Sequence, residues 1–284
     1  MARNHRPLTD HAADAAVEAA CKVLHLSVIR ETYQDQLAAA ARAQLSHRAF
    51  LAELLMSECE VRERRRNETR LRAAGFPRPK WLADFDFDAN PAVDQAVIAT
   101  LAEGEWIRRG EPLCLIGDSG TGKSHLLIAL GSAATQRGFR VRYCSAAKLV
   151  NELVEAADEK VLTKTIARYG RVDLLCIDEF GYLELDRRGA ELLFQVLTER
   201  EEKNSVAIAS NENFSGWAKT FTDPRLCAAI VDRLTFRATI IETGTESYRL
   251  KHARSSIPQQ PQASPSATGT AKTDISPLGG SKSE

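Results

Sequence analysis

The chain has 284 residues, 44% of them hydrophobic and 27% charged, which is typical of a globular protein with a buried core. Its 38 basic residues balance 38 acidic ones, so the net charge neither supports nor excludes a nucleic-acid partner, and the six spread cysteines form no CxxC pair. The N-terminus lacks the apolar core of a signal peptide and no apolar run could span a membrane, which predicts a cytoplasmic protein with no membrane partner.

The first part of the chain, residues 1–75, is predicted to form a small all-helical domain. The segment from residue 8 to residue 74 is rich in Ala, Leu, Glu and Arg and contains no glycine. Apolar residues recur there at helical spacing, at Phe50, Leu51, Leu54, Leu55 and Val61. Ser46 is a suitable N-cap for this helix, and Gly75 with the prolines that follow it ends the helix. Two or three helices fit this segment.

A local excess of positive charge lies at the end of this helical segment. Eight basic residues stand against three acidic ones between Glu60 and Lys80, which leaves a formal charge of +5. This excess favours contact with DNA phosphates, and because no aromatic residue lies among the arginines we expect binding that is independent of sequence. The alternative is a solvated helix face with i,i+4 ion pairs. The candidate DNA-binding residues are Arg62, Arg64, Arg65, Arg66, Arg70 and Arg72.

The rest of the chain divides into three parts. Residues 76–92 mix turn formers with aromatics and are predicted to be a linker whose side chains dock on another part of the protein. Residues 93–252 alternate between strand-like and helix-like stretches, which predicts an α/β fold with a mainly parallel five-stranded sheet. The expected strands are residues 113–116, 141–144, 173–177, 206–210 and 238–242. Residues 253–284 are dominated by Ser, Pro, Thr, Gly and Gln, which predicts a disordered tail.

A phosphate-binding loop follows the first of these strands. Residues 117–124 match the pattern G-x-x-x-x-G-K-[ST] at every fixed position, between a predicted strand and a predicted helix. The backbone amides and the helix N-terminus are expected to hold the phosphates of ATP, with Lys123 at the β- and γ-phosphates and Ser124 as a ligand of Mg²⁺. The predicted ATP-binding residues are Gly117, Asp118, Ser119, Gly120, Thr121, Gly122, Lys123, Ser124 and His125.

Three polar residues follow two later strands. Asp178 and Glu179 come directly after an apolar run, at the end of a strand where ligands of open α/β sheets bind. We expect Asp178 to hold Mg²⁺ and Glu179 to activate the attacking water, a division of roles that favours hydrolysis over transfer to a small acceptor. Asn211 ends the next strand and is expected to contact the γ-phosphate or the water, although Asn also ends strands because it tolerates turns.

Two arginines lie before the last strand. Arg233 and Arg237 belong to the stretch "IVDRLTFRA". Either could reach the nucleotide of a neighbouring subunit and stabilise charge in the transition state, with Arg233 preferred. The alternative is a surface arginine in a salt bridge.

Taken together, these motifs resemble those of the IstB-like transposition helper ATPases, members of the AAA+ group that are related to DnaC-type helicase loaders. The resemblance rests on "GDSGTGKSHLLIALG", "RVDLLCIDEFGYLELD", "ASNENFSGW", "DPRLCAAIVDRL" and "ESYRL" and covers residues 8–250. By position, residues 117–124 become the Walker A loop, Asp178 and Glu179 the Walker B pair, Asn211 the first sensor and Arg233 the arginine finger. No helical lid fits after the last strand, although Arg249 could stand in for a second sensor.

The resemblance also implies a function. It implies an ATPase that forms homo-oligomers on double-stranded DNA and recruits and activates the cognate transposase of an insertion sequence. Under this reading residues 1–75 serve DNA binding and assembly. A replicative helicase loader is the alternative within the same fold, and a small-molecule kinase is disfavoured because Asp178 and Glu179 suit hydrolysis.

Overall fold

The computed structural model describes residues 9–181, 185–221 and 223–248. The predicted disordered tail and Arg249 lie outside these described residues. Within them, five strands form one sheet in the order β2-β3-β4-β1-β5, and every pairing between these strands is parallel. The strands are β1 (Leu113–Ile116), β2 (Val141–Ser145), β3 (Leu174–Phe180), β4 (Ser205–Ser210) and β5 (Thr239–Glu242). The parallel five-stranded α/β sheet predicted from the sequence is therefore confirmed.

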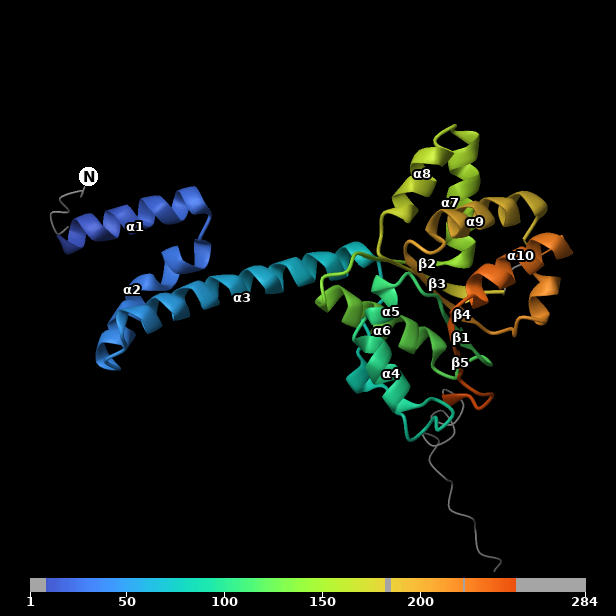
Figure 1. The fold of residues 1–284 in the computed structure, drawn as a ribbon, viewed down its shortest axis with the longest axis horizontal. Helices are drawn as coiled ribbons and strands as arrows, with labels where there is room; N and C mark the ends of the chain where they lie inside the picture. The colour runs from blue at the N-terminus through green and yellow to red at the C-terminus, as the bar shows by residue number, and fades with distance from the viewer. Residues whose placement is uncertain (1–8, 182–184, 222, 249–284) are drawn as a thin grey trace, which may run out of the picture.

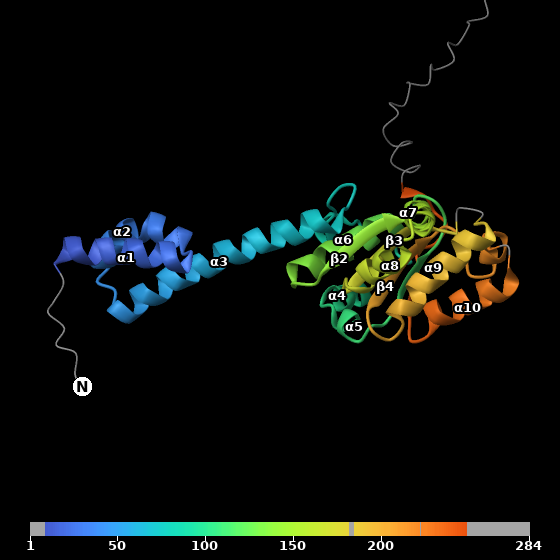
Figure 2. The ribbon, with the colours of Figure 1, turned by 90° about the horizontal axis from the view of Figure 1, so that it is seen from above.

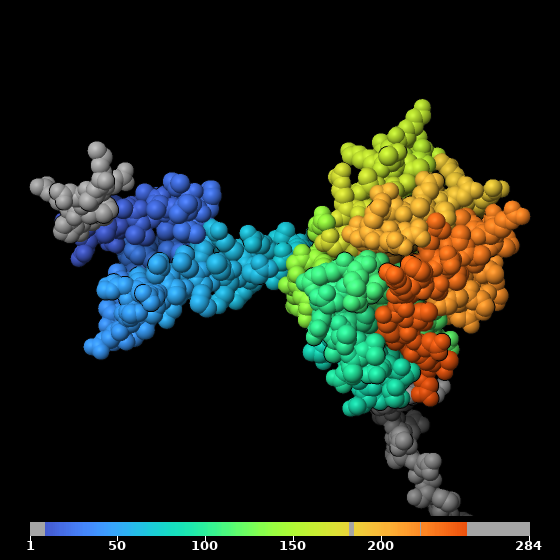
Figure 3. Space-filling view, viewed as in Figure 1, coloured from blue at the N-terminus to red at the C-terminus, as the bar shows by residue number. Residues whose placement is uncertain are grey.

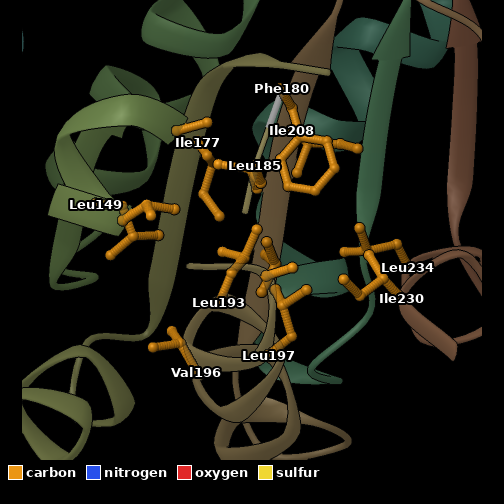
Figure 4. Close-up of a cluster of buried hydrophobic side chains, with 14 of the residues drawn as sticks. Leu149, Ile177, Phe180, Leu185, Leu193, Val196, Leu197, Ile208, Ile230 and Leu234 are labelled. Atoms are coloured by element: carbon orange, nitrogen blue, oxygen red, sulfur yellow. The ribbon is translucent and has the colours of Figure 1, made fainter. Parts of the chain in front are cut away.

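Helices cover both faces of this sheet because successive strand residues point to opposite sides. Cys114 and Ile116 of β1 belong to one buried cluster, whereas Leu113 and Leu115 belong to the other. The first cluster, part of which is drawn in Figure 4, packs under α7 (Ala146–Asp158), α8 (Leu162–Gly170), α9 (Arg187–Arg200) and α10 (Pro224–Thr235). The second packs under α4 (Gln95–Ala102), α5 (Glu105–Arg108) and α6 (Lys123–Gln136). We call the described residues from 93 to 248 the sheet core.

Three helices precede the sheet core, as the sequence predicted for this region. They are α1 (Asp10–Leu24), α2 (Ser27–Arg42) and α3 (His47–Ala74), and we call them the helical arm. The side chain of Ser46 accepts a hydrogen bond from the backbone N–H of Ala49, and Gly75 ends α3 with a φ of +75°, so both predicted ends of α3 are confirmed. Figures 1 and 2 show α3 running from α1 and α2 to the sheet core, and Figure 3 shows the arm standing apart from it.

The segment after the arm, residues 76–92, lies against the sheet core. It contains one turn of 3-10 helix, η1 (Leu82–Asp84), and a second such turn, η2 (Gly216–Lys219), follows β4. Phe76, Leu82, Phe85 and Phe87 pack against the second buried cluster. The docking of aromatic side chains that the sequence predicted therefore takes place on the sheet core.

Candidate ATP-binding and hydrolysis site

The phosphate loop leaves the carboxyl end of β1 and enters α6 at Lys123. Gly122 has a φ of +96°, and a Cβ atom there would lie 2.6 Å from the ring of Phe85, so both the backbone conformation and the close approach require glycine. The segment after β5 holds the loop from the other side. The N–H of Asp118 donates to the carbonyl of Gly244 (3.0 Å), and the hydroxyls of Thr121 and Thr243 are 2.6 Å apart.

Lys123 is the first residue of α6, and only 5% of it is exposed. Its Nζ donates to the backbone oxygen of Asp118 at 2.6 Å, so the ammonium group lies against the loop on which phosphates are expected to bind. The positive end of α6 points the same way, because the first amides of a helix have no partner within the helix. Lysine and helix together form a site for an anion.

Asp178 meets Ser124 at the carboxyl end of β3. The hydroxyl of Ser124 donates to Asp178 Oδ1 at 3.0 Å, and Asp178 is 5% exposed. These are oxygen donors on adjacent elements, which is the chemistry that Mg²⁺ prefers. Among the described residues, no group of three or more His, Cys, Asp or Glu side chains is arranged so that it could hold a metal ion. The two residues therefore fit the predicted metal site.

Glu179 follows Asp178 with an unusual backbone. Its φ is +56°, and the register between β3 and β4 shifts between Ile177 and Phe180. A non-glycine residue in this region costs about 1 kcal/mol or more, and such strain occurs often at functional sites. The bulge leaves Glu179 exposed, whereas its neighbours Asp178 and Phe180 are buried. Glu179 also lines the cavity in which the attacking water is expected.

One cavity of about 550 Å³ gathers these residues, and its size suits a nucleotide. Its lining includes the loop from Ser119 to His125 together with Asp178, Glu179 and Asn211. Asn211 lies there because it directly follows β4, the strand between β1 and β3. The structure thus places the residues predicted for phosphate, metal and water around one space, apart from Gly117 and Asp118, which hold the loop to its neighbours.

The linker also contributes to this cavity, which the sequence analysis did not predict. The side-chain amide of Asn90 donates to the carbonyls of Thr121 (2.8 Å) and Thr243 (3.0 Å) and so joins the phosphate loop to the segment after β5. The ring of Phe85 meets that of His125 edge-on, with centroids 5.5 Å apart. The density of aromatics in residues 76–92 was the available signal, but it did not reveal which surface they contact.

A second unpredicted group is Tyr143 on β2. Its hydroxyl donates to Asp178 Oδ2 at 2.8 Å. Burial raises the pKa of Tyr143, and the carboxylate of Asp178 raises it further. The tyrosine is therefore a hydrogen-bond donor to the carboxylate that is expected to hold the metal.

Arg233 lies on α10, outside the lining of this cavity. Its Nε donates to Glu201 at 2.9 Å, and its guanidinium lies 4.2 Å from the centre of the Phe194 ring. Arg237 is exposed. Arg233 thus forms a salt bridge, which was the alternative role predicted from the sequence. If Arg233 contacts a nucleotide, that nucleotide must be bound to another subunit.

The arginines of α3 fall into two groups. Arg62 donates to Glu58 (3.0 Å) and to the carbonyl of His25, and Arg70 donates to Glu63 (2.6 Å) and to the carbonyl of Thr135 (3.1 Å). These two arginines hold the arm together or join it to α6. The other four predicted residues, Arg64, Arg65, Arg66 and Arg72, are exposed. Three of them also make surface contacts: Arg65 with Ser27, Arg66 with Glu63 and Arg72 with the carbonyl of Glu68.

Comparisons with known proteins agree with the geometry of this site. A family profile described as IstB-like ATP binding protein matches residues 19–256. An insertion sequence IS21 ATP-binding protein from Pseudomonas aeruginosa is 38% identical over 233 residues, which cover 82% of this chain and 87% of that protein. An insertion sequence IS5376 ATP-binding protein from Geobacillus stearothermophilus is 35% identical over 234 residues, which cover 82% of this chain and 93% of that protein.

Among solved structures, DnaI is 20% identical with a TM-score of 0.49, over 62% of this chain and 93% of that one.

None of the helices in the described part of the chain combines the length and the apolar character that crossing a bilayer requires. The motifs around the cavity, the parallel strand order and the match over residues 19–256 lead to one assignment. The chain has a parallel α/β fold with a P-loop and belongs to the family of IstB-like ATP-binding proteins, which confirms the family resemblance seen in its sequence.

Proposed function

We propose that this protein is an ATPase that serves as the helper of an insertion-sequence transposase. In this proposal it binds ATP with Mg²⁺, assembles as a homo-oligomer on double-stranded DNA, recruits and activates its cognate transposase, and hydrolyses ATP. The observation that carries the proposal is the placement of Lys123, Ser124, Asp178 and Glu179 around one cavity. Relatives named as ATP-binding proteins of insertion sequences supply the biological setting.

The residues of the cavity divide the chemistry between them. Lys123 and the amides of the loop bind the phosphates and offset their charge. Ser124 and Asp178 would hold Mg²⁺, which supplies further positive charge at the phosphates when it is bound. Glu179 takes the proton of the attacking water, and the amide of Asn211 orients that water or the γ-phosphate. Each residue therefore has one task in hydrolysis.

The proposed DNA contact lies on the arm. Arg64, Arg65, Arg66 and Arg72 are exposed on α3, and they are joined to the cavity by a linker that packs against the phosphate loop. Guanidinium groups on a helix surface suit phosphate oxygens, which carry no sequence information. We infer that DNA binding is largely independent of sequence and that nucleotide state affects it through the linker.

The test compares Glu179→Gln with Lys123→Ala. We expect Glu179→Gln to bind ATP like the wild type but to release phosphate at least about 100-fold more slowly, because an amide cannot take the proton of water. Lys123→Ala should lose ATP binding itself. Glu103→Gln, at an exposed carboxylate outside the cavity, is the matched control and should behave like the wild type. Wild-type turnover by Glu179→Gln would remove Glu179 from the proposed role.

The DNA part of the proposal needs its own measurement. Duplex binding is measured with ATP, with ADP and without nucleotide, and the cognate transposase is then tested for capture by the DNA-bound complex. We expect ATP to favour assembly and Glu179→Gln to keep the complex on DNA. Equal duplex affinity in all three nucleotide states would contradict the coupling. If the transposase binds the DNA equally well with and without this protein, the helper function is contradicted.

A further inference from the structure

Asp178 receives three hydrogen bonds, and one of them comes from outside the phosphate-loop and Asp-Glu motifs. Ser124 Oγ (3.0 Å) and the backbone N–H of Glu179 (2.9 Å) both donate to Oδ1. Among the described residues, only Tyr143 donates to Oδ2, through its hydroxyl at 2.8 Å. The two oxygens of the carboxylate are therefore held from two directions.

The sheet places Tyr143 at this position. In the parallel register of β2 and β3, Tyr143 lies opposite Cys176 and Ser145 lies opposite Asp178. Tyr143 and Asp178 are thus displaced by two residues along the strands, which puts both side chains on the same face of the sheet. A long phenolic side chain spans that displacement, so its hydroxyl reaches the carboxylate at the strand end.

We propose that Tyr143 is a positioning residue for Asp178, which fixes the rotation of the carboxylate so that Oδ1 stays beside Ser124, where the two residues would hold Mg²⁺. This inference rests on the proposed function, because it assigns a role relative to the predicted metal site. Rotation of the carboxylate about its Cβ–Cγ bond would break the two hydrogen bonds to Oδ1, and the bond from Tyr143 to Oδ2 adds a third that must break, so the hydroxyl makes the observed orientation more favourable. Hydrogen bonds to metal-binding side chains raise metal affinity in this way.

Tyr143 is in turn held by the first residue of the linker. The ring of Phe76 lies 5.8 Å from that of Tyr143, centre to centre, at an interplanar angle of 57°. Phe76 directly follows Gly75, the residue that ends α3, and its ring also fills the space over Gly131 of α6. The end of the helical arm is therefore connected to Asp178 through two side chains, Phe76 and Tyr143.

The main test is Tyr143→Phe, which keeps the ring and removes only the hydroxyl. Binding of a fluorescent, non-hydrolysable ATP analogue is titrated with Mg²⁺ and, separately, in the presence of EDTA. We expect the Mg²⁺ concentration for half-maximal binding to rise about tenfold, with affinity in EDTA unchanged and the melting temperature lowered no more than in the control variant Tyr169→Phe. A Mg²⁺ titration identical to that of the wild type would overturn the inference.

Tyr169→Phe is the matched control. Tyr169 is 2% exposed, and its hydroxyl also donates to a carboxylate, Glu152 at 2.5 Å, on the helices α8 and α7 and outside the cavity. Its Mg²⁺ titration should equal that of the wild type. A shift as large as that of Tyr143→Phe would mean that loss of a buried hydroxyl acts through general loosening, and would also overturn the inference.

Phe76→Leu tests the connection to the arm. We expect it to reproduce part of the Mg²⁺ shift alone and to add little in the Tyr143→Phe background, because both changes would act on one hydrogen bond. Full additivity would separate Phe76 from Asp178 and overturn that connection. If the wild type binds nucleotide without any dependence on Mg²⁺, the proposed function itself fails. If the wild type depends on Mg²⁺ and Tyr143→Phe does so equally, only the present inference fails.

Discussion

The helical arm and the sheet core bury apolar side chains to very different extents. In the arm one small cluster forms around Cys21, Ile29 and Leu54, whereas two extended clusters cover both faces of the sheet. Seven large apolar side chains of the arm stay exposed, which is more than the six found in the rest of the described chain. They are Val23, Leu24, Leu37, Leu45, Leu51, Leu55 and Met56. The core buries most of its large apolar side chains in these two clusters, while the arm keeps apolar surface that suits contacts with other molecules.

The arm instead depends on a buried polar contact. Glu58 of α3 is 3% exposed, and its Oε2 accepts hydrogen bonds from the backbone N–H groups of Val28 (2.8 Å) and Ile29 (3.1 Å). These amides lie at the start of α2, where no residue of α2 itself provides a side-chain cap. Burial by itself would raise the pKa of Glu58, but the hydrogen bonds from Ile29, Val28 and Arg62 lower it overall. A carboxylate from another helix thus caps α2.

The largest effect that we predict concerns whether a single sheet core is a complete ATPase. If Arg233 completes the site of a neighbouring subunit, Arg233→Ala should bind ATP normally and hydrolyse it at least about 100-fold more slowly. Mixing it with Lys123→Ala protein should restore part of the activity, because each variant supplies what the other lacks. Phosphate release by the mixture and by each variant alone is the measurement.

Glu201→Gln is the control for this experiment, because it weakens the ion pair of Arg233 and leaves the arginine in place. It should retain most of the activity. An equal loss in Glu201→Gln and Arg233→Ala would assign Arg233 a structural role, since both changes break the same contact. If Arg237→Ala loses activity and regains it on mixing with Lys123→Ala protein, whereas Arg233→Ala does not, Arg237 is the arginine finger.

The two regions also differ in how much of them the sequence predicted. Lys123, Ser124 and Asp178 were found because strand, turn and helix are contiguous there and bring their own chemistry. Tyr143 and Asn90 were missed because their partners, Asp178 and Thr243, are brought to them only by the sheet register and by chain closure.

In the arm, the sequence shows how many arginines there are. It does not show that Arg62 and Arg70 donate hydrogen bonds to carbonyls of other segments, because these bonds depend on helix packing. The sequence also did not reveal that Glu58 caps α2. The reason is the same: its two backbone donors lie about thirty residues away in sequence, and nothing local marks a carboxylate as buried.

The next prediction decides which region holds DNA. Changing Arg64, Arg65 and Arg66 together to Ala should weaken duplex binding equally for all sequences and flatten its salt dependence by about one unit per lost phosphate contact. Arg62 and Arg70 are left in place because the fold uses them. The matched control removes the same charge elsewhere, at the exposed Arg108, Arg137 and Arg171. Duplex affinity is measured against salt concentration. A stronger effect in the control would place the DNA site on the sheet core.

A smaller effect should separate the stability of the two regions. Glu58→Gln keeps an acceptor of similar shape but removes the charge, so the start of α2 should lose about 1 kcal/mol of stabilisation. Hydrogen exchange resolved by segment is the measurement. Amides of α1 and α2 should exchange faster, while those of β1, β3 and β4 should be unchanged. Equal acceleration in the sheet would mean that arm and core unfold as one unit and do not differ in stability.

The smallest predicted effect is a pH dependence of the stability of α2, which arises from the titration of Glu58. Because its pKa in the folded protein is lower than in the unfolded chain, where glutamate titrates at about 4.3, its stabilising contribution is complete above that pH. The contribution is lost as the pH falls through the lower, folded value, since the protonated side chain no longer offers a charged acceptor to Val28 and Ile29. Exchange in α2, corrected for the intrinsic rate at each pH, should therefore differ between wild type and Glu58→Gln at pH 7 and converge on acidification. A difference that persists undiminished at pH 3 would show that the shape of the side chain, and not its charge, caps α2.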